Sequence, residues 1–132
     1  MAYWLLKSDP DTYGFADLER DHRTTWDGVS NPVAVKHLRS IKEGDECLVY
    51  HTGEEKSVIG LATAASDARP DPKNPKLAVF DLEAVERLPH PVTLAAVKAD
   101  PTFADFALVR QPRLSVMPVP PSLWKRLLSM AR

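Results

Sequence analysis

Short apolar runs, separated by polar or proline-rich segments, dominate the sequence. Residues 3–6 are aromatic or aliphatic and stop at a Ser-Asp-Pro-Asp sequence, which predicts a buried first strand that ends in a turn. Runs of β-branched, aromatic and aliphatic residues predict further strands over residues 24–26, 47–51, 57–62, 77–85 and 114–119. Gly60 interrupts one of these runs and predicts a bulge or a close approach of other backbone.

Capping residues and helical spacing predict short helices between these strands. Asn31 can accept hydrogen bonds from the first backbone amides of a helix, and Pro32 suits the first helical position, so we expect a helix that begins here and ends before Gly44. The pair Phe15 and Leu18 predicts a short helix over residues 15–20. The remaining helices are expected over residues 94–98, capped by Thr93, and over residues 103–108 and 122–128.

Proline is unusually frequent, because the chain has twelve prolines and five glycines. Proline cannot donate a hydrogen bond to a sheet and breaks helix interiors, so its clusters at residues 70–75, 89–91 and 118–121 are expected to be connections between elements. Short strands that mix with short helices, without a regular strand–helix–strand repeat, predict the α+β class with a small, barrel-like mixed sheet. The length of 132 residues suits one domain.

Composition narrows the possible function classes. Apolar residues make up 44% of the chain and charged residues 27%, which is typical of a folded protein. The formal net charge of −1 argues against a polybasic surface for nucleic acid or membrane. No apolar run approaches the ~20 residues of a membrane span, and the first residues lack the pattern of a signal peptide. The single cysteine, Cys47, excludes an internal disulfide, so we expect a cytoplasmic protein.

The charges are unevenly divided along the chain. Residues 1–60 hold seven Lys or Arg and eleven Asp or Glu, whereas residues 61–132 hold ten and seven. No carboxylate side chain follows Asp105, but five cationic side chains do. Two interpretations stay open here: a basic C-terminal end that meets phosphate, or chance together with cations placed near a helix C-terminus.

The sequence offers little for catalysis. The four histidines are scattered and lack metal-ligand spacing, and no glycine-rich phosphate loop is present. Asp9 and Asp11 belong to a predicted turn, which needs no metal. Cys47 lies in an apolar, strand-like run, which favours a buried and unreactive thiol. We therefore expect no catalytic residue, no metal and no cofactor.

Five sequence blocks occur in an order and at a spacing that are distinctive of one family. They are Tyr3–Tyr13, Thr24–Val29, Gly44–Asp45, Tyr50–Gly53 and Ala107–Val116. These blocks resemble the EVE domain family over nearly the whole chain, so residues 1–132 are identified as one EVE domain. The resemblance implies a PUA-like fold, a small mixed β pseudo-barrel decorated with short helices, related to the YTH readers of methylated adenosine. It implies a monomeric, non-catalytic module that reads a modified base of DNA or RNA in a pocket.

The chain departs from the family pattern in two places. Many members continue after the block around Trp26 with Arg-Asn-Tyr-Gln-Ala-Arg-Asn, where residues 30–36 of this chain are Ser-Asn-Pro-Val-Ala-Val-Lys. Many members also have Gln-Ser-Arg where this chain has Gln111-Pro112-Arg113. Both changes remove basic or polar groups near the expected ligand face.

Recognition of a base outside its stack requires an aromatic face, donors and acceptors for the base edge, and cations for the flanking phosphates. Trp26, beside the predicted turn, is the aromatic candidate, and a core position is its alternative. Trp4 and Trp124 are expected in the core. Lys7 and Ser8 end the first predicted strand, where they present an ammonium and a hydroxyl group.

Further ligand-binding candidates follow along the chain. Asn31 is either a helix cap or a reader of the base edge through its paired amide donor and acceptor. Tyr50 and His51 end a predicted strand, where they either contact the base or pack at the rim of the sheet. The resemblance adds four residues of the last block: Arg110, Gln111, Arg113 and Ser115.

We expect the pocket where the end of the first strand, the Trp26 turn and residues 110–115 converge. Two alternatives from other functional classes stay open. Some small PUA-like relatives with an ASCH domain are amidohydrolases that use a lysine with a nearby carboxylate, and Lys7 is the candidate for that role. A protein-interaction module is the second alternative, and a large exposed apolar patch would favour it.

Overall fold

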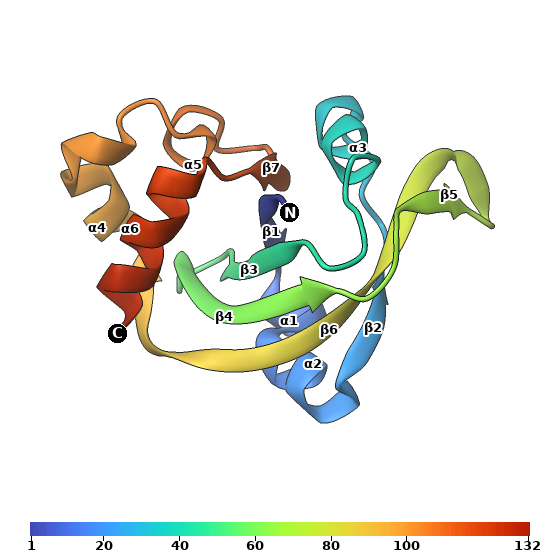
Figure 1. Cartoon of the computed structure of the whole chain (residues 1–132), viewed down its shortest axis with the longest axis horizontal. Coiled ribbons are helices and arrows are strands. Elements are labelled where there is room, and N and C mark those ends of the chain that lie inside the picture. Colours follow the sequence, from blue (N-terminus) through green and yellow to red (C-terminus); the bar gives the residue numbers. More distant parts are fainter.

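The computed structural model describes all 132 residues of the chain. Short helices surround one strongly curved sheet (Figure 1). The strands are β1 (Tyr3–Ser8), β2 (Arg23–Trp26), β3 (Glu46–His51), β4 (Ser57–Ala64), β5 (Arg69–Asp71), β6 (Asn74–Thr93) and β7 (Val116–Pro118). The helices are α1 (Pro10–Tyr13), α2 (Phe15–Asp21), α3 (Pro32–Leu38), α4 (Leu94–Ala99), the 3-10 helix η1 (Pro101–Phe103), α5 (Ala107–Arg110) and α6 (Pro121–Ala131).

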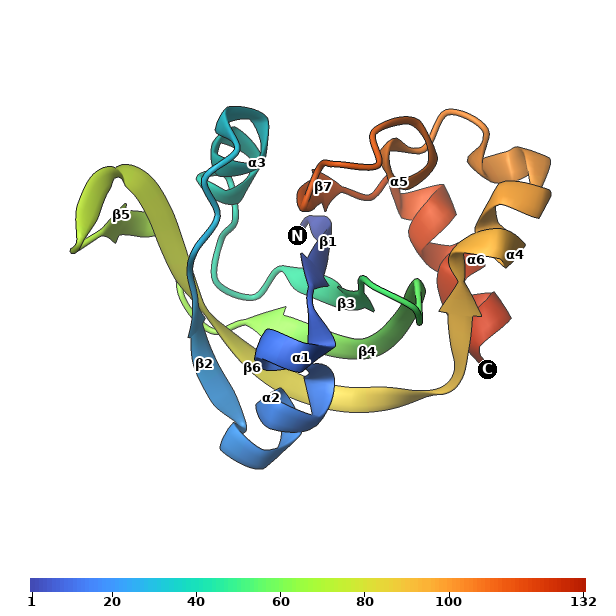
Figure 2. The ribbon, with the colours of Figure 1, turned by 180° about the vertical axis from the view of Figure 1, so that it is seen from behind.

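The sheet is mixed, which confirms the predicted α+β class. Its strand order is β2-β6-β4-β3-β1-β7, and β5 pairs with β6. The β1–β3 pair is parallel, and the other pairs are antiparallel. Strand β6 is 20 residues long and sweeps past the other strands from the β5 hairpin to α4 (Figures 1 and 2). This arrangement leaves the end of β1 beside α1, opposite β2 and α3 (Figure 2).

Two proline-rich segments differ from their prediction as connections. Residues 66–76 contain β5 and the start of β6, which form a hairpin. Pro89 and Pro91 do not end the strand, because β6 continues to Thr93. The register of β6 with β4 shifts between Arg87 and Val92, so the two prolines lie where the sheet requires no regular hydrogen-bond donors.

Several predicted bounds near the C-terminus are also wrong. The expected helix over residues 103–108 is replaced by η1 and α5, which the turn after Phe103 separates. Phe103 and Phe106 both point into the core there, with ring centroids 5.9 Å apart. The expected strand over residues 114–119 shortens to β7. In contrast, Thr93 caps α4 as predicted, because its hydroxyl accepts a hydrogen bond from the amide of Ala96.

The hydrophobic core is one cluster of 35 buried residues. Trp4 and Trp124 belong to it, as predicted, and the ring of Trp124 stacks on that of Tyr3 with centroids 4.6 Å apart. This contact packs α6 against the start of β1. Cys47 is fully buried, and burial raises the pKa of its thiol, which agrees with the predicted unreactive cysteine.

Asp45 is a buried carboxylate at the start of β3. It accepts hydrogen bonds from the amide of Ala2 at 3.0 Å, the indole N–H of Trp4 at 2.9 Å and the amide of Lys42 at 3.0 Å. Burial by itself would raise the pKa of this carboxyl group, but the three donors outweigh burial and hold the pKa below its usual value. The ionised group thereby joins the start of β1 to the turn before β3.

Gly60 lies at an irregularity of the β4–β6 pair, as predicted for a bulge. The close approach to this glycine comes from a side chain, because the ring of Phe15 fills the space that a Cβ atom would occupy. Phe15 is fully buried and begins α2. The absence of a side chain at residue 60 therefore lets α2 pack directly against the sheet.

Asp81 on β6 holds β2 and β5 together. Its carboxylate accepts hydrogen bonds from Arg23 at 3.0 Å, Thr25 at 3.0 Å and Arg69 at 2.9 Å. The hydrogen bonds from Arg69 and Arg23 lower the pKa of Asp81 to about 2. Since β2 ends at Trp26, this cluster also fixes the strand that carries the predicted aromatic residue.

We expect Gly60→Ala to lower the free energy of unfolding by ~1–3 kcal/mol, because its methyl group overlaps the Phe15 ring. Urea denaturation measures this change. In a Phe15→Leu background, the added methyl group meets a smaller side chain and is expected to cost less. An equal cost in both backgrounds would contradict this packing model.

Asp81 is expected to make the protein more sensitive to acid. Its folded pKa of about 2 lies below the ordinary value, so its contribution is complete above about pH 5 and is lost as the pH falls through the folded pKa. Wild type should therefore lose ~1–2 kcal/mol more stability than Asp81→Asn between about pH 5 and about pH 2. Chemical denaturation at several pH values measures this difference. Equal loss of unfolding free energy by the two proteins over this pH range would contradict it.

Candidate functional site

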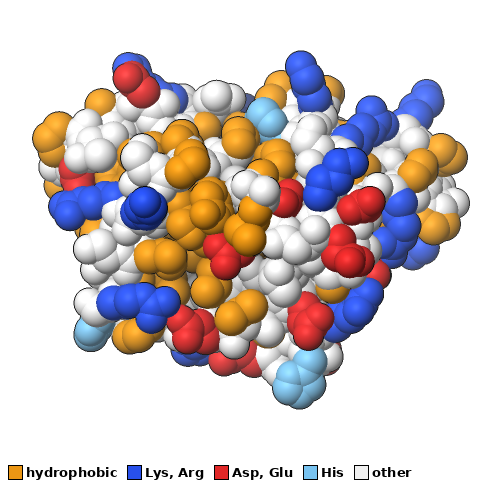
Figure 3. All heavy atoms as spheres, viewed as in Figure 1, with side chains coloured by type: hydrophobic (Ala, Val, Ile, Leu, Met, Phe, Trp, Pro, Cys, Tyr) orange, Lys and Arg blue, Asp and Glu red, His pale blue; other side chains and the backbone are white.

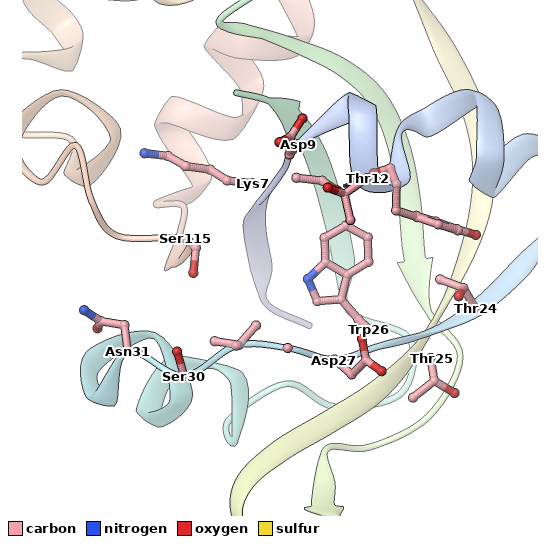
Figure 4. Close-up of a pocket in the computed structure, with 14 residues that line it drawn as sticks. Lys7, Asp9, Thr12, Thr24, Thr25, Trp26, Asp27, Ser30, Asn31 and Ser115 are labelled. Carbon is pink, nitrogen blue, oxygen red and sulfur yellow. Dashed lines mark hydrogen bonds between the residues drawn. The ribbon is translucent and has the colours of Figure 1, made fainter. Parts of the chain in front are cut away.

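A hollow of about 670 Å³ lies where the end of β1, helix α1, strand β2 and the loop before α3 meet. We call it the base hollow. Figure 4 shows that its side chains come from segments far apart in the sequence. The predicted convergence of the first strand and the Trp26 turn is present, and Ser115 brings the last block to the same place. Five of the sequence-predicted site residues line the hollow: Lys7, Ser8, Trp26, Asn31 and Ser115.

Trp26 belongs both to the core and to the wall of the base hollow. The side chain is 8% exposed, and its residue pairs with Phe80 across the β2–β6 ladder. The indole N–H of Trp26 has no hydrogen-bond partner within the protein. Because every fully buried polar side-chain atom of the protein has such a partner, this N–H cannot be fully buried. The indole nitrogen is therefore accessible to solvent, and it lies on the side of the hollow that holds Lys7 and Ser115 (Figure 4).

The end of β1 forms a fixed wall of the hollow. The amide of Lys7 donates to the carbonyl of Ser115 at 2.9 Å, and the Lys7 ammonium donates to the carbonyl of Pro112 at 2.9 Å. Burial lowers the pKa of this ammonium group. The Ser8 hydroxyl donates to the carbonyl of Tyr13, so its proton is already engaged within the protein.

Asn31 caps α3, which confirms the predicted helix start. Its Oδ1 atom accepts hydrogen bonds from the amides of Val33 at 2.9 Å and Ala34 at 3.1 Å. These two bonds occupy the acceptor capacity of the side chain, so its paired donor and acceptor are not both available to a base edge. The Nδ2 group retains two N–H donors at the rim of the hollow. The helix ends at Leu38, earlier than the predicted end near Gly44.

Two other predicted residues lie behind the wall. His51 is buried, accepts a hydrogen bond at Nε2 from the amide of Phe15 at 2.9 Å, and contacts Glu55 through Nδ1 at 3.2 Å. These contacts match the alternative in which it packs at the rim of the sheet. Tyr50 is buried under the Lys7 ammonium, which lies 5.6 Å from its ring centroid, and it lines a neighbouring groove.

The remaining candidates lie beside the hollow or away from it. Gln111 and Arg113 line a smaller hollow of about 280 Å³ that shares Asn31 with the base hollow. The structure does not bring Arg110 to either hollow, because its guanidinium donates to the carbonyl of Ala104 and pairs with Asp105.

Sequence reasoning missed several residues that line the base hollow. Tyr13 contributes a second aromatic ring, whose hydroxyl donates to Asp21 at 2.9 Å. Asp9 and Asp27 contribute carboxylates, and the Asp9 side chain caps α1. All three belong to sequence blocks that resemble the family, but residues in turns and one-turn helices show no periodic pattern that indicates the direction of their side chains.

The basic C-terminal end does not form a free cationic surface. Three of its five cations are paired with carboxylates of the preceding segments: Arg110 with Asp105, Arg126 with Asp100, and Arg132 with Glu86. On the face shown in Figure 3, Lys and Arg side chains lie among Asp and Glu side chains. Most cations of the C-terminal end are therefore neutralised within the protein.

No group of three or more His, Cys, Asp or Glu side chains is arranged to hold a metal ion. None of the helices has the length and apolarity that a membrane crossing requires.

Comparison with known proteins identifies one family. The EVE domain model matches residues 2–130. Human thymocyte nuclear protein 1 is 26% identical over 154 aligned residues, which cover 89% of this chain and 68% of the human protein.

Solved structures show the same fold. A protein from Rhodopseudomonas palustris is 38% identical, with a TM-score of 0.94 over 99% of this chain and 93% of that chain. Human thymocyte nuclear protein 1 in complex with DNA containing 5-methylcytosine is 24% identical, with a TM-score of 0.93 over 100% and 98% of the two chains. An ASCH protein from Zymomonas mobilis is 14% identical, with a TM-score of 0.63 over 99% and 96%. These likenesses confirm the predicted PUA-like fold.

Substitution of Asn31 separates its cap from its free amide donors. Asn31→Ala removes the cap and is expected to cost ~1 kcal/mol of stability. Asn31→Asp keeps the accepting oxygen, so its stability should stay close to that of wild type, but it loses both N–H donors. Thermal or urea unfolding of the two variants tests the cap. Equal destabilisation by both substitutions would contradict it.

Proposed function

The chain belongs to the EVE domain family, and from that premise we propose that it binds nucleic acid and holds one modified base in the base hollow over Trp26. The human relative that was solved with 5-methylcytosine DNA supports a modified cytosine as the first candidate ligand. Both DNA and RNA are candidate polymers, and binding experiments with each can distinguish them.

The observation that carries the proposal is an indole ring that is fixed in the core and also lines the hollow. Because β2 and the core hold Trp26, the ring needs no ordering when a ligand arrives. Stacking of a base on an aromatic side chain contributes ~1–3 kcal/mol, which offsets part of the stacking lost when the base leaves its strand. The volume of about 670 Å³ is in the range of small-molecule sites.

Three polar groups in the lining of the hollow have free hydrogen-bonding capacity. They are the indole N–H of Trp26, the Nδ2 donors of Asn31 and the hydroxyl of Ser115. Asp27 adds a carboxylate acceptor, which can accept a hydrogen bond from an exocyclic amino group such as that of cytosine. This set includes both donors and acceptors, as recognition of a base edge requires.

The amidohydrolase alternative finds less support around Lys7. Its ammonium donates to the Pro112 carbonyl and has no carboxylate within 4.0 Å, whereas that mechanism requires a lysine with a nearby carboxylate. The likeness to the ASCH protein reflects the fold alone. We therefore propose a binding module without catalysis.

The test compares two substitutions of Trp26 that differ in aromaticity. Trp26→Phe keeps a ring for stacking, whereas Trp26→Leu keeps only apolar volume. We expect Trp26→Leu to reduce the preference for modified over unmodified oligonucleotides ~5–100-fold, and Trp26→Phe to retain most of it. Titration of fluorescent DNA and RNA strands with modified or unmodified cytosine and adenine measures this preference.

Circular dichroism and unfolding curves identify any variant that fails to fold. Arg110→Gln serves as a matched surface control, because Arg110 lies away from the base hollow. If folded Trp26→Leu keeps the full preference, the base does not stack on this ring and the proposed site is wrong.

A further inference from the structure

Two smaller hollows adjoin the base hollow around the loop over residues 111–115. One shares Asn31 with the base hollow and contains Arg113. The other, about 310 Å³, shares Lys7 with the base hollow. Pro112 lines both smaller hollows, so the loop separates them and each of the three hollows adjoins the other two.

The hollow that shares Lys7 is lined by three lysines, and we call it the lysine groove. Lys56 comes from the loop before β4, Lys98 from α4 and Lys7 from the end of β1. No carboxylate lines this groove, whose remaining surface comes from apolar side chains, the Thr52 residue and backbone. Three cations from three separate elements thus converge without an internal counter-charge.

The lysines of the groove are available to a ligand. Lys56 and Lys98 are exposed and take part in no ion pair. The nearest acidic side chain along the loop, Glu55, contacts His51 instead. This differs from the C-terminal arginines, most of which are neutralised within the protein.

The backbone of Lys56 adopts an unusual conformation. Its φ of 43° lies in the left-handed region, which non-glycine residues rarely adopt. A hydrogen bond of 2.7 Å from the amide of Leu94 to the carbonyl of Lys56 holds this conformation. The loop therefore places a lysine where a glycine would adopt the backbone at lower cost.

The charged residues that line the base hollow are mostly acidic, whereas those that line the lysine groove are all basic. The base hollow is lined by two carboxylates, those of Asp9 and Asp27, and by one lysine, Lys7. A phosphate is therefore disfavoured beside the base and favoured in the groove, where only cations are present. Lys7 lies at the junction between the two.

We infer that the lysine groove binds the phosphodiester that adjoins the base held over Trp26. The inference rests on the proposed function for the position of the base, and it adds a defined path for the chain that carries it. Lys56 and Lys98 contact the phosphate oxygens, and the apolar floor of the groove accommodates the adjoining sugar. The groove supplies affinity that depends on salt but not on the base.

The test removes two charges from the groove and two from elsewhere. Lys56→Gln/Lys98→Gln is compared with Lys73→Gln/Lys125→Gln, which changes two exposed lysines away from both hollows. The probe is a short single-stranded DNA with one central 5-methylcytosine, titrated at several salt concentrations. The groove variant should show a log–log salt slope that is shallower by ~0.7 for each phosphate that it no longer neutralises. The control should keep the wild-type slope, and both variants should keep the wild-type preference for the modified strand.

A second probe locates the contact. It replaces the phosphate on one side of the 5-methylcytosine with a neutral methylphosphonate. On one of the two sides, this replacement should weaken binding by wild type and leave the affinity of the groove variant unchanged. The inference is wrong if the groove variant and the control variant have equal salt slopes. It is also wrong if the two methylphosphonate replacements weaken binding by wild type and by the groove variant equally. A different result separates the two proposals. If wild type shows no preference for any modified strand but the two variants differ in salt slope, then the proposed base recognition is wrong and the phosphate contact stands.

Discussion

The carboxylate of Asp45 sets the position of β1, and the base hollow depends on that position. Three donors from the start of β1 and from the turn before β3 meet on this one buried group. They fix a parallel register in which Tyr3 pairs with Glu46 and Ser8 pairs with His51. A slip of one residue would turn every side chain of β1 to the opposite face of the sheet. An ion pair is unnecessary, because the donors satisfy the charge where it is buried.

Local sequence patterns predicted the parts of this fold that depend on neighbouring residues. The Asn31-Pro32 pair specifies a helix start through its own hydrogen bonds, and the apolar runs specify the strands around Trp4 and Gly60. The length of β6 was not predictable from such patterns. Pro89 and Pro91 normally interrupt a strand, and only the register shift opposite β4 makes them tolerable. That shift is a property of two strands together, which no single segment reveals.

The candidate site shows the same division. Local sequence features indicated Lys7, Ser8, Trp26 and Asn31, because each lies at a recognisable strand end, turn or cap. The availability of their polar atoms depends on contacts with distant segments or on the detailed geometry of a turn. The Lys7 ammonium is directed to a carbonyl more than a hundred residues away in the sequence, and the Ser8 hydroxyl to a carbonyl of the following helix. The pairing of the C-terminal arginines is equally non-local and reversed the meaning of a simple charge count.

The departures from the family pattern acquire a physical meaning in this arrangement. Where many members carry arginine and tyrosine after the Trp26 block, this chain has a capped helix start at Asn31. The helix cap fixes the rim of the base hollow but supplies no positive charge there, and the carboxylates of Asp9 and Asp27 add negative charge. A nucleic-acid ligand nevertheless brings phosphates close to the base. In the proposed arrangement, the cations of the lysine groove, one of which is shared with the base hollow, supply the compensating charge at a distance from the base. This proposal assigns selectivity and affinity to adjacent but separate surfaces, so that a substitution in one surface can leave the contribution of the other intact.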